Sequence, residues 1–554
     1  MPQPTRSGGK VLADALVANK VGHIFCVPGE SYLPVLDALY DYRRQVEVIV
    51  CRQEGGAAYM AEAYGKLRGC PGVCFVSRGP GASNAMIGVH TAFQDSTPLL
   101  LFIGQIPRAE RGREAFQELD YTRIYPGVAK QVLRIDRAAD IPPRLFEAWM
   151  TAISDRPGPV VVELPEDMLN DQVAVEDCAA PTRPAARPPN AEAIARFDDL
   201  LRQSQRPVII CGGAAWTAET NRALAEFSEK HAVPVACAFR RQDMFDNTHP
   251  YYIGELGIAP HPELLGLVQQ SDLVIALAAR LGEMTTTGYT LFEVPAFDTS
   301  GARKLVHVFP SAAELNSVFR ADLGLDCDAE TFLRAVQSLG GPDHSTRPAA
   351  ARRARIERAR NAYLGVMQQP GNRGAKLRLD RIMAFLRARL PADSIIASGA
   401  GNYTIWAQRN YQFSRPNTQL ACTNGSMGYG VPAAIAGKLA RPQSTVVSFS
   451  GDGCFLMNGQ ELATAVRYRL NIIFLVINNR CYGTIRSHQQ RRFPGRPMAT
   501  SLVNPDFAAL ARAYGAFGAR VARTDEFAHT FEQALNAGRP ALIELPVDDS
   551  ESGQ

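Results

Sequence analysis

One strand–helix–strand pattern in the last quarter of the chain constrains the fold most. An apolar run, Thr445–Ser450, leads into Gly451-Asp452-Gly453, and a second run, Asn471–Ile477, leads into Asn478-Asn479. The helix-like stretch Gly459–Arg469 lies between them. Strand, helix and strand in this order form a βαβ unit, whose crossover places the two strands parallel and side by side. The pattern therefore predicts a parallel α/β sheet.

Two side chains with oxygen ligands follow the two predicted strands. Asp452 and Asn479 are 27 positions apart, and each lies where a strand reaches the carboxyl edge of the sheet. A carboxylate and an amide oxygen at this edge form a natural site for Mg²⁺ that holds a diphosphate. Asp-Gly and Asn-Asn are also common in turns and loops. The prediction therefore depends on the pair, its spacing and the strand before each member.

The chain is too long for a single hydrophobic core. Its 554 residues suggest three domains. Two segments without apolar periodicity, Asp177–Asn190 and Gly340–Pro348, divide it. We expect domains at about 1–176, 190–338 and 375–548. Short β-branched runs alternate with amphipathic stretches in all three, so each is predicted to be an α/β domain with a doubly wound parallel sheet.

Composition argues against several classes of function. The net charge is only +4 and no dense basic stripe occurs, so no nucleic-acid partner is expected. No apolar run has membrane-spanning length and the N-terminus lacks an apolar signal core, so neither a membrane protein nor a secreted protein is expected. The 11 cysteines are scattered without a zinc-site pattern, which favours reduced thiols and a cytoplasmic location.

The segment Gly451–Thr464, followed by Asn478-Asn479, resembles the thiamine-diphosphate (ThDP) motif and in particular the catalytic subunit of acetolactate synthase. The resemblance covers nearly the whole chain. It implies the family's domain order, which is a pyrimidine-binding domain, a middle Rossmann-like domain and a diphosphate-binding domain. It also implies that Asp452, Asn479 and the main-chain carbonyl of Cys481 bind Mg²⁺. A main-chain ligand tolerates any side chain, so a cysteine is acceptable at 481.

Glu54 is the candidate catalytic acid. It follows a strand-like run that ends at Val50 and begins a helix of small residues, where the helix dipole favours a carboxylate even without a catalytic role. In the family, a glutamate at this position hydrogen-bonds N1′ of the aminopyrimidine and promotes its imino tautomer. The imino nitrogen then removes the thiazolium C2 proton and generates the ylid. The resemblance thus gives Glu54 control of this proton transfer.

The resemblance also implies further cofactor contacts. Met427 matches a bulky residue that holds the cofactor bent, although a methionine also commonly fills gaps in an ordinary core. The carbonyl of Gly425 would accept from the 4′-amino group, and Asn402 and Tyr403 would contact the diphosphate. The remaining cofactor-binding candidates are Pro28, Gly451, Gly453 and Cys454.

The family builds each site between the first domain of one subunit and the third domain of its neighbour. The resemblance therefore implies that the Glu54 and Asp452 of one site come from different chains. A homodimer or a dimer of dimers is expected.

Four residues are substrate-pocket candidates through the resemblance. Phe116 and Gln117 would line the pocket, with Gln117 contacting the reacting groups, and Lys130 could hold an acidic substrate. His488 stands where the biosynthetic synthase has a tryptophan that selects the second ketoacid. A more polar acceptor pocket is therefore expected, for another 2-ketoacid or a dione.

Other positions depart from the family pattern. Arg78 either adds a fork for a carboxylate or pairs with an acid, and His90 is either a proton shuttle or a structural histidine. In the middle domain, Ile209–Ala214 and Ala278–Arg280 are similar to FAD-binding turns. The family's acidic strand end is replaced here by His307-Val-Phe-Pro-Ser311, so bound FAD and an empty structural domain both stay open.

These features predict a ThDP- and Mg²⁺-dependent enzyme that decarboxylates a 2-ketoacid and transfers the enamine to an acceptor carbonyl. The alternative enzyme is a ThDP-dependent decarboxylase or C–C hydrolase of an aromatic ketoacid or dione, similar to benzoylformate decarboxylase. A flavin oxidase agrees less well, because Asp548–Gln554 is a short acidic end rather than an amphipathic membrane tail. The chain could also be a binding protein that keeps the cofactor fold without catalysis, but the presence of Glu54, Asp452 and Asn479 argues against this alternative.

Overall fold

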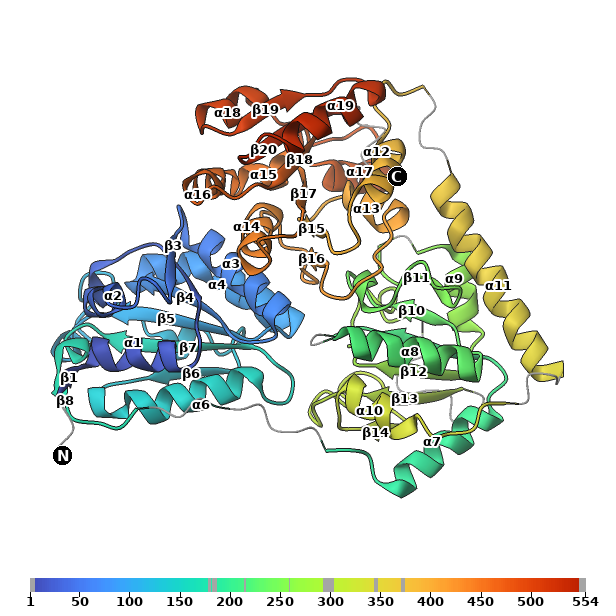
Figure 1. The fold of residues 1–554 in the computed structure, drawn as a ribbon, viewed down its shortest axis with the longest axis horizontal. Coiled ribbons are helices and arrows are strands. Elements are labelled where there is room, and N and C mark those ends of the chain that lie inside the picture. Colours follow the sequence, from blue (N-terminus) through green and yellow to red (C-terminus); the bar gives the residue numbers. More distant parts are fainter. Residues whose placement is uncertain are drawn as a thin grey trace.

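Three six-stranded sheets, each parallel throughout, form three domains in the computed structural model (Figure 1). The predicted α/β class with three doubly wound sheets is confirmed. The structure describes residues 5–177, 181, 187–213, 216–258, 260–291, 303–342, 347–369 and 374–547. The predicted linker Asp177–Asn190 therefore lies partly outside the described residues, and the acidic end Asp548–Gln554 lies wholly outside them.

The first domain has strand order β3-β2-β4-β5-β7-β6. Along β4, Val73 and Phe75 face one hydrophobic core while Cys74 and Val76 face another, so both faces of the sheet are buried. Near-continuous apolar strands are what a parallel sheet covered on both faces requires. Its main elements are α1 (Gly8–Ala18), β2 (His23–Cys26), α2 (Leu33–Tyr40), β3 (Glu47–Val50), α3 (Glu54–Arg68), β4 (Gly72–Ser77), α4 (Arg78–Asp95), β5 (Leu99–Gln105), β6 (Gln131–Arg134), α6 (Ile141–Ile153) and β7 (Pro159–Pro165).

The third domain repeats the topology of the first. Its strand order is β16-β15-β17-β18-β20-β19. When the strands of each sheet are numbered along the chain, both sheets have the order 2-1-3-4-6-5. Its main elements are β15 (Ile395–Ser398), α13 (Thr404–Asn410), β16 (Gln419–Ala421), α14 (Gly430–Ala440), β17 (Val446–Gly451), α15 (Asp452–Leu456), α16 (Leu462–Arg467), β18 (Ile473–Asn478), α17 (Gly483–Arg492), α18 (Phe507–Ala513), β19 (Phe517–Arg520), α19 (Thr524–Leu535) and β20 (Ala541–Pro546).

The middle domain has a different order, β11-β10-β9-β12-β13-β14, which is the order of dinucleotide-binding folds. The long helix α11 (Arg347–Gln368) runs along its outer side and leads to the third domain (Figure 1). The middle strands are β9 (Pro207–Cys211), β10 (Val235–Cys237), β11 (Tyr252–Glu255), β12 (Leu273–Leu277), β13 (Lys304–Val308) and β14 (Leu323–Leu325). Among the described helices, none is both long and apolar enough to cross a membrane.

Helices α3 and α14 join the first and third domains. Each follows the second strand of its own sheet, and the two pack against each other within one shared core. Small residues such as Ala57 and Ala61 on α3 and Ala433 and Ala436 on α14 are completely buried there, and their size permits close helix packing. This contact fixes the helix that begins with Glu54 against the domain that carries Asp452.

Candidate functional site

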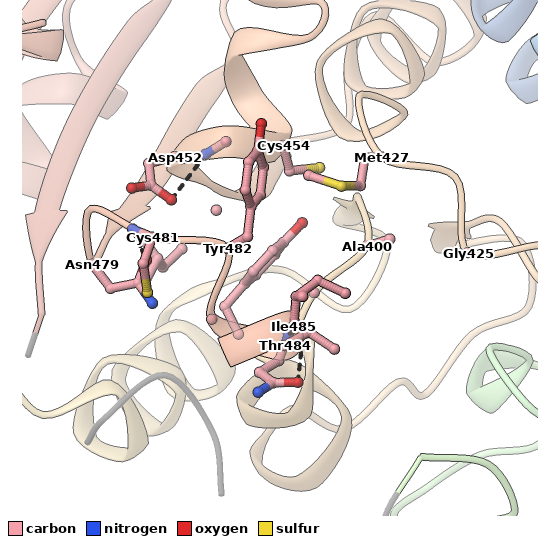
Figure 2. A pocket seen from close by; sticks show the side chains of 17 residues that line it. Ala400, Gly425, Met427, Asp452, Cys454, Asn479, Cys481, Tyr482, Thr484 and Ile485 are labelled. Atoms are coloured by element: carbon pink, nitrogen blue, oxygen red, sulfur yellow. Dashed lines mark hydrogen bonds between the residues drawn. The ribbon is translucent and has the colours of Figure 1, made fainter. Parts of the chain in front are cut away.

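A pocket of about 240 Å³ opens where β15, β17 and β18 of the third domain end (Figure 2). Ligands of doubly wound folds bind at this carboxyl edge, at the point where neighbouring connections diverge to opposite faces. All ten cofactor-binding candidates of this domain line the pocket. They are Asn402, Tyr403, Gly425, Met427, Gly451, Asp452, Gly453, Cys454, Asn479 and Cys481. Sequence reasoning missed Ala400, Gly401, Ile477 and the run Tyr482–Ile485, which also line it.

Asp452 is a buried carboxylate whose described hydrogen-bond partners are neutral N–H groups. It is 2% exposed at the start of α15. Its Oδ1 accepts from the amide of Gly453 at 2.9 Å and its Oδ2 from Asn504 Nδ2 at 2.7 Å. Burial raises the pKa of this carboxyl. A buried anion with only neutral donors is costly without a cation, so the residues present suit a bound divalent metal.

The two asparagines that follow β18 differ in their contacts. Asn478 is buried, donates to Glu544 Oε1 at 2.8 Å and accepts from the amide of Arg480 at 3.2 Å. Asn479 lines the pocket, and its Oδ1 accepts from the amide of Cys481 at 3.2 Å. An amide oxygen has two lone pairs, so that of Asn479 keeps one for a metal. Figure 2 shows Asp452, Asn479 and Cys481 at the same end of the pocket.

Glycines shape the wall around Tyr403. A Cβ atom at Gly401 or Gly451 would lie 2.7 or 2.8 Å from the Tyr403 ring, so neither position has room for a side chain. Tyr403 is 6% exposed and its ring fills this space. Next to it, the amide of Asn402 donates to Thr484 Oγ1 at 3.0 Å and ties this loop to α17. The glycine-rich turns thus leave the pocket open for a ligand. The hydrogen bond of Asn402 holds the loop against α17.

Met427 lies between the pocket and the core of the third domain. It lines the pocket and also packs against the core of the third domain. Its carbonyl accepts from the Tyr59 hydroxyl at 3.3 Å, which links the loop to the first domain. The preceding Gly425 has φ = +69°, a conformation that favours glycine. The wedge role of Met427 stays a prediction.

The first-domain candidates lie elsewhere on the same chain. Glu54 is the first residue of α3, and its Oε2 accepts from Asn84 Nδ2 at 2.9 Å. Pro28 follows β2, and Phe116 and Gln117 lie on the loop after β5, so all four are at the carboxyl edge of the first sheet. None of them lines the third-domain pocket. Phe116 is 73% exposed, which leaves this edge open to another surface.

Glu461, which sequence reasoning did not single out, connects the third domain to the start of α3. Its side chain is completely buried, and Oε1 accepts from the amides of Arg52 and Gln53 at 2.9 and 3.0 Å. A Cβ at Gly56 would lie 2.7 Å from the same oxygen, which explains the small residue there. Burial raises the pKa of the Glu461 carboxyl. A buried carboxylate of the third domain thus accepts hydrogen bonds from the two backbone amides just before Glu54.

Replacement of Glu461 should separate its acceptor role from its charge. In Glu461→Ala two partly buried backbone amides lose their acceptor, which costs roughly 2–4 kcal/mol of stability. Glu461→Gln keeps an oxygen for both amides and should stay near wild type. Thermal unfolding of both variants measures the difference as a lower apparent melting temperature for the alanine variant. Equal melting temperatures would show that this interdomain contact contributes little.

The structure gives contacts for three residues considered for the substrate side. Lys130 donates to the carbonyls of Thr151 and Ser154 at 2.5 and 2.8 Å, and burial lowers the pKa of its ammonium to about 8. It therefore caps the end of α6 instead of holding a substrate. Arg78 pairs with Glu166 at 2.6 Å, which selects the ion-pair alternative. His488 is exposed on α17 beside Arg491 and does not line the pocket of its own chain, so its role at the acceptor stays a prediction.

His90 lines a different cavity, of about 460 Å³, at the junction of the three domains. Its Nδ1 lies 3.3 Å from Asn424 Nδ2, so it contacts the loop that leads to Met427. This contact favours the structural interpretation.

The middle domain keeps only part of a nucleotide-binding turn. Gly213 follows β9 with φ = +80°, and a Cβ there would lie 2.3 Å from the Ala278 carbonyl oxygen. Gly213 borders two cavities of about 400 and 460 Å³. Phe309 and Pro310 follow β13, at the strand end where the resemblance leads us to expect an acid. Arg280 donates to Glu314 at 3.0 Å. Ala214, the last residue of the predicted turn, lies outside the described residues.

Comparisons with known proteins agree with this geometry. Profiles of the "Thiamine pyrophosphate enzyme" family match residues 6–124 as its N-terminal TPP binding domain, 194–336 as its central domain and 399–545 as its C-terminal TPP binding domain. The acetolactate synthase isozyme 2 large subunit of Escherichia coli is 32% identical, and the alignment covers 99% of this chain and 96% of that protein. The acetolactate synthase large subunit of Corynebacterium glutamicum is 30% identical, with 98% and 87% covered.

Proposed function

This chain belongs to the thiamine pyrophosphate enzyme family, and we propose that it decarboxylates a 2-ketoacid and transfers the remaining acyl fragment to a carbonyl acceptor. The observation that carries the proposal is the convergence of Asp452, Asn479 and Cys481 at one end of a pocket in the ThDP-binding domain. Relatives named acetolactate synthase support the carboligase activity.

We assign roles to this chain's own residues. Bound ThDP would supply a stabilised carbanion for attack on the ketoacid carbonyl. Asp452, Asn479 and the Cys481 carbonyl would hold Mg²⁺ and through it the diphosphate. Glu54 would hold or release a proton at N1′ of the aminopyrimidine ring. The Asn84 amide, 2.9 Å from the Glu54 carboxylate, would keep that side chain in place.

The complete site would require a second copy of the chain. The pocket is lined by residues 400–485 alone, while Glu54, Phe116 and Gln117 lie at the open edge of the first sheet. Several apolar side chains around α17 are exposed in the single chain, which supports burial of this surface against a second copy. They are Ile485, Phe493, Met498 and Val503, at 53%, 62%, 76% and 101% exposure. We therefore propose a homodimer with the third domain of one protomer against the first domain of its partner, or a dimer of two such dimers.

Product analysis tests the proposed reaction. A panel of 2-ketoacids and diones is incubated with the enzyme, ThDP and Mg²⁺, with and without aldehyde or ketoacid acceptors. CO₂ and organic products are measured together. We expect CO₂ from at least one donor and a hydroxyketone product when an acceptor is present. An aldehyde as the sole product would favour the decarboxylase alternative, and an acid without CO₂ would favour a C–C hydrolase. No reaction with any donor or dione would contradict the proposal.

The flavin question and the assembly have direct measurements. The Rossmann-type strand order and Gly213 support a nucleotide in the middle domain, while the missing strand-end acid opposes the family's FAD contact. A yellow colour in the purified protein would establish bound flavin. Sedimentation equilibrium would distinguish a dimer from a tetramer, and a strictly monomeric protein at assay concentration would contradict the two-chain site.

A further inference from the structure

Asn504 contacts the predicted metal site from outside the pocket. It lies between α17 and α18, and it does not line the pocket. Its Nδ2 donates to Asp452 Oδ2 at 2.7 Å and to Asn478 Oδ1 at 2.9 Å. These acceptors follow or end the adjacent strands β17 and β18. One side-chain amide thus joins the two strand ends that carry the predicted ligands.

The contacts fix the direction of the Asp452 carboxylate. Each of its oxygens accepts an N–H group, Oδ1 from Gly453 and Oδ2 from Asn504. Each oxygen keeps lone-pair capacity for a metal. The Oδ1 of Asn504 is itself buried without a hydrogen-bond partner. The reversed amide would place this oxygen against two other oxygens, so the observed contacts allow only the donating orientation.

The same residue is linked to the segment that carries α17. The amide of Tyr482 donates to the Thr500 carbonyl and that of Leu502 to the Arg480 carbonyl, both at 2.8 Å. Cys481 and Ser501 form an antiparallel bridge between them. This stem closes the excursion from Gly483 to residue 499, and Asn504 follows it by two residues. The third predicted ligand, Cys481, belongs to the same stem.

We propose that Asn504 is a positioning residue for the metal site, which orients Asp452 toward the cation and anchors the α17 stem to it. The inference rests on the proposed Mg²⁺–ThDP site. Removal of a side chain that hydrogen-bonds a metal ligand typically lowers metal affinity 10- to 100-fold. Loss of the Asn504 donor should therefore weaken metal binding while leaving the chemical step intact.

Two variants test this assignment, Asn504→Ala and the near-isosteric Asn504→Leu. Binding of Mn²⁺ in the presence of ThDP is measured by electron paramagnetic resonance on the full-length enzyme. We expect Kd for Mn²⁺ to rise at least tenfold in both variants, while kcat at saturating Mn²⁺ changes less than threefold. The matched control is Asn471→Ala. Asn471 is also half-buried in this domain and donates to the Leu535 carbonyl at 3.3 Å, but it lies at the opposite end of β18.

The outcomes distinguish this proposal from the proposed function. Wild-type Mn²⁺ affinity in both variants would overturn the role of Asn504 alone. A fall in kcat at saturating Mn²⁺ as large as the change in Kd would also overturn it, because the residue would then act beyond metal positioning. If the wild-type enzyme itself binds no Mn²⁺ with ThDP, the metal site and the proposed function both fail.

Discussion

Glu54→Gln is expected to bind ThDP and Mg²⁺ as tightly as the wild type does, and to turn over 2-ketoacids at least about 100-fold more slowly. The lower bound follows from the usual 10²- to 10⁴-fold contribution of a positioned general acid or base. Glutamine has the same shape and can still accept from Asn84, so the fold at the start of α3 should not change. The neutral amide, however, cannot hold the proton at N1′.

Exchange kinetics separate binding from proton transfer in this variant. Calorimetry gives the ThDP affinity, and deuterium exchange at C2 of the bound cofactor, followed by NMR, gives the rate of the proton-transfer step. Glu47→Gln is the matched control, because Glu47 lies in the same domain at the amino end of β3, away from the site. Wild-type turnover in Glu54→Gln would disprove the catalytic assignment.

Replacement of Asp452 by asparagine is expected to remove Mg²⁺-dependent ThDP binding. The loss of ThDP affinity should exceed the 10- to 100-fold effect of removing a residue that only hydrogen-bonds a metal ligand, because here a charged ligand of the metal itself is removed. Asparagine keeps the size of the side chain, so the wall around Gly451 and Tyr403 should stay intact. Calorimetric titration with ThDP at fixed Mg²⁺ measures the affinity. Unchanged affinity would place the metal elsewhere.

The pH dependence provides a second check on Asp452. Burial raises the pKa of its carboxyl, and only the deprotonated form binds a metal. As the pH falls, Mg²⁺-dependent binding should therefore weaken at a higher pH than for an ordinary aspartate. Asp525→Asn, an exposed aspartate in the first turn of α19 of the same domain, is the control and should change neither affinity nor its pH profile.

The third-domain site was predictable because its signals are local. The strands before Asp452 and Asn479 are apolar and short, and a parallel pair necessarily brings their carboxyl ends to one edge. The same logic placed Glu54 at the start of a helix. The resemblance already singled out Asn479 as the ligand, and the structure adds the contacts that separate the two asparagines, because Asn478 is buried against Glu544 while Asn479 lines the pocket.

The sequence left the partners of Lys130 and Arg78 undecided, because these contacts depend on distant segments. Lys130 reaches the end of α6, and Arg78 reaches Glu166, 88 positions away. Glu461 and Asn504 gave no motif in the sequence, because their partners come from other elements of the chain. A single sequence shows the type of a charged or amide side chain, but its partner depends on chain packing.

The amino-acid sequence alone determined the parallel α/β class, the ThDP-type motif and the residues at the ends of β17 and β18, because strand periodicity and turn chemistry act over a few neighbouring residues. The tertiary structure decided that α3 packs on α14, that Glu461 caps the approach to Glu54 and that Asn504 holds Asp452. These arrangements satisfy buried hydrogen-bonding groups across long separations in the chain, and that requirement is set by the packed fold.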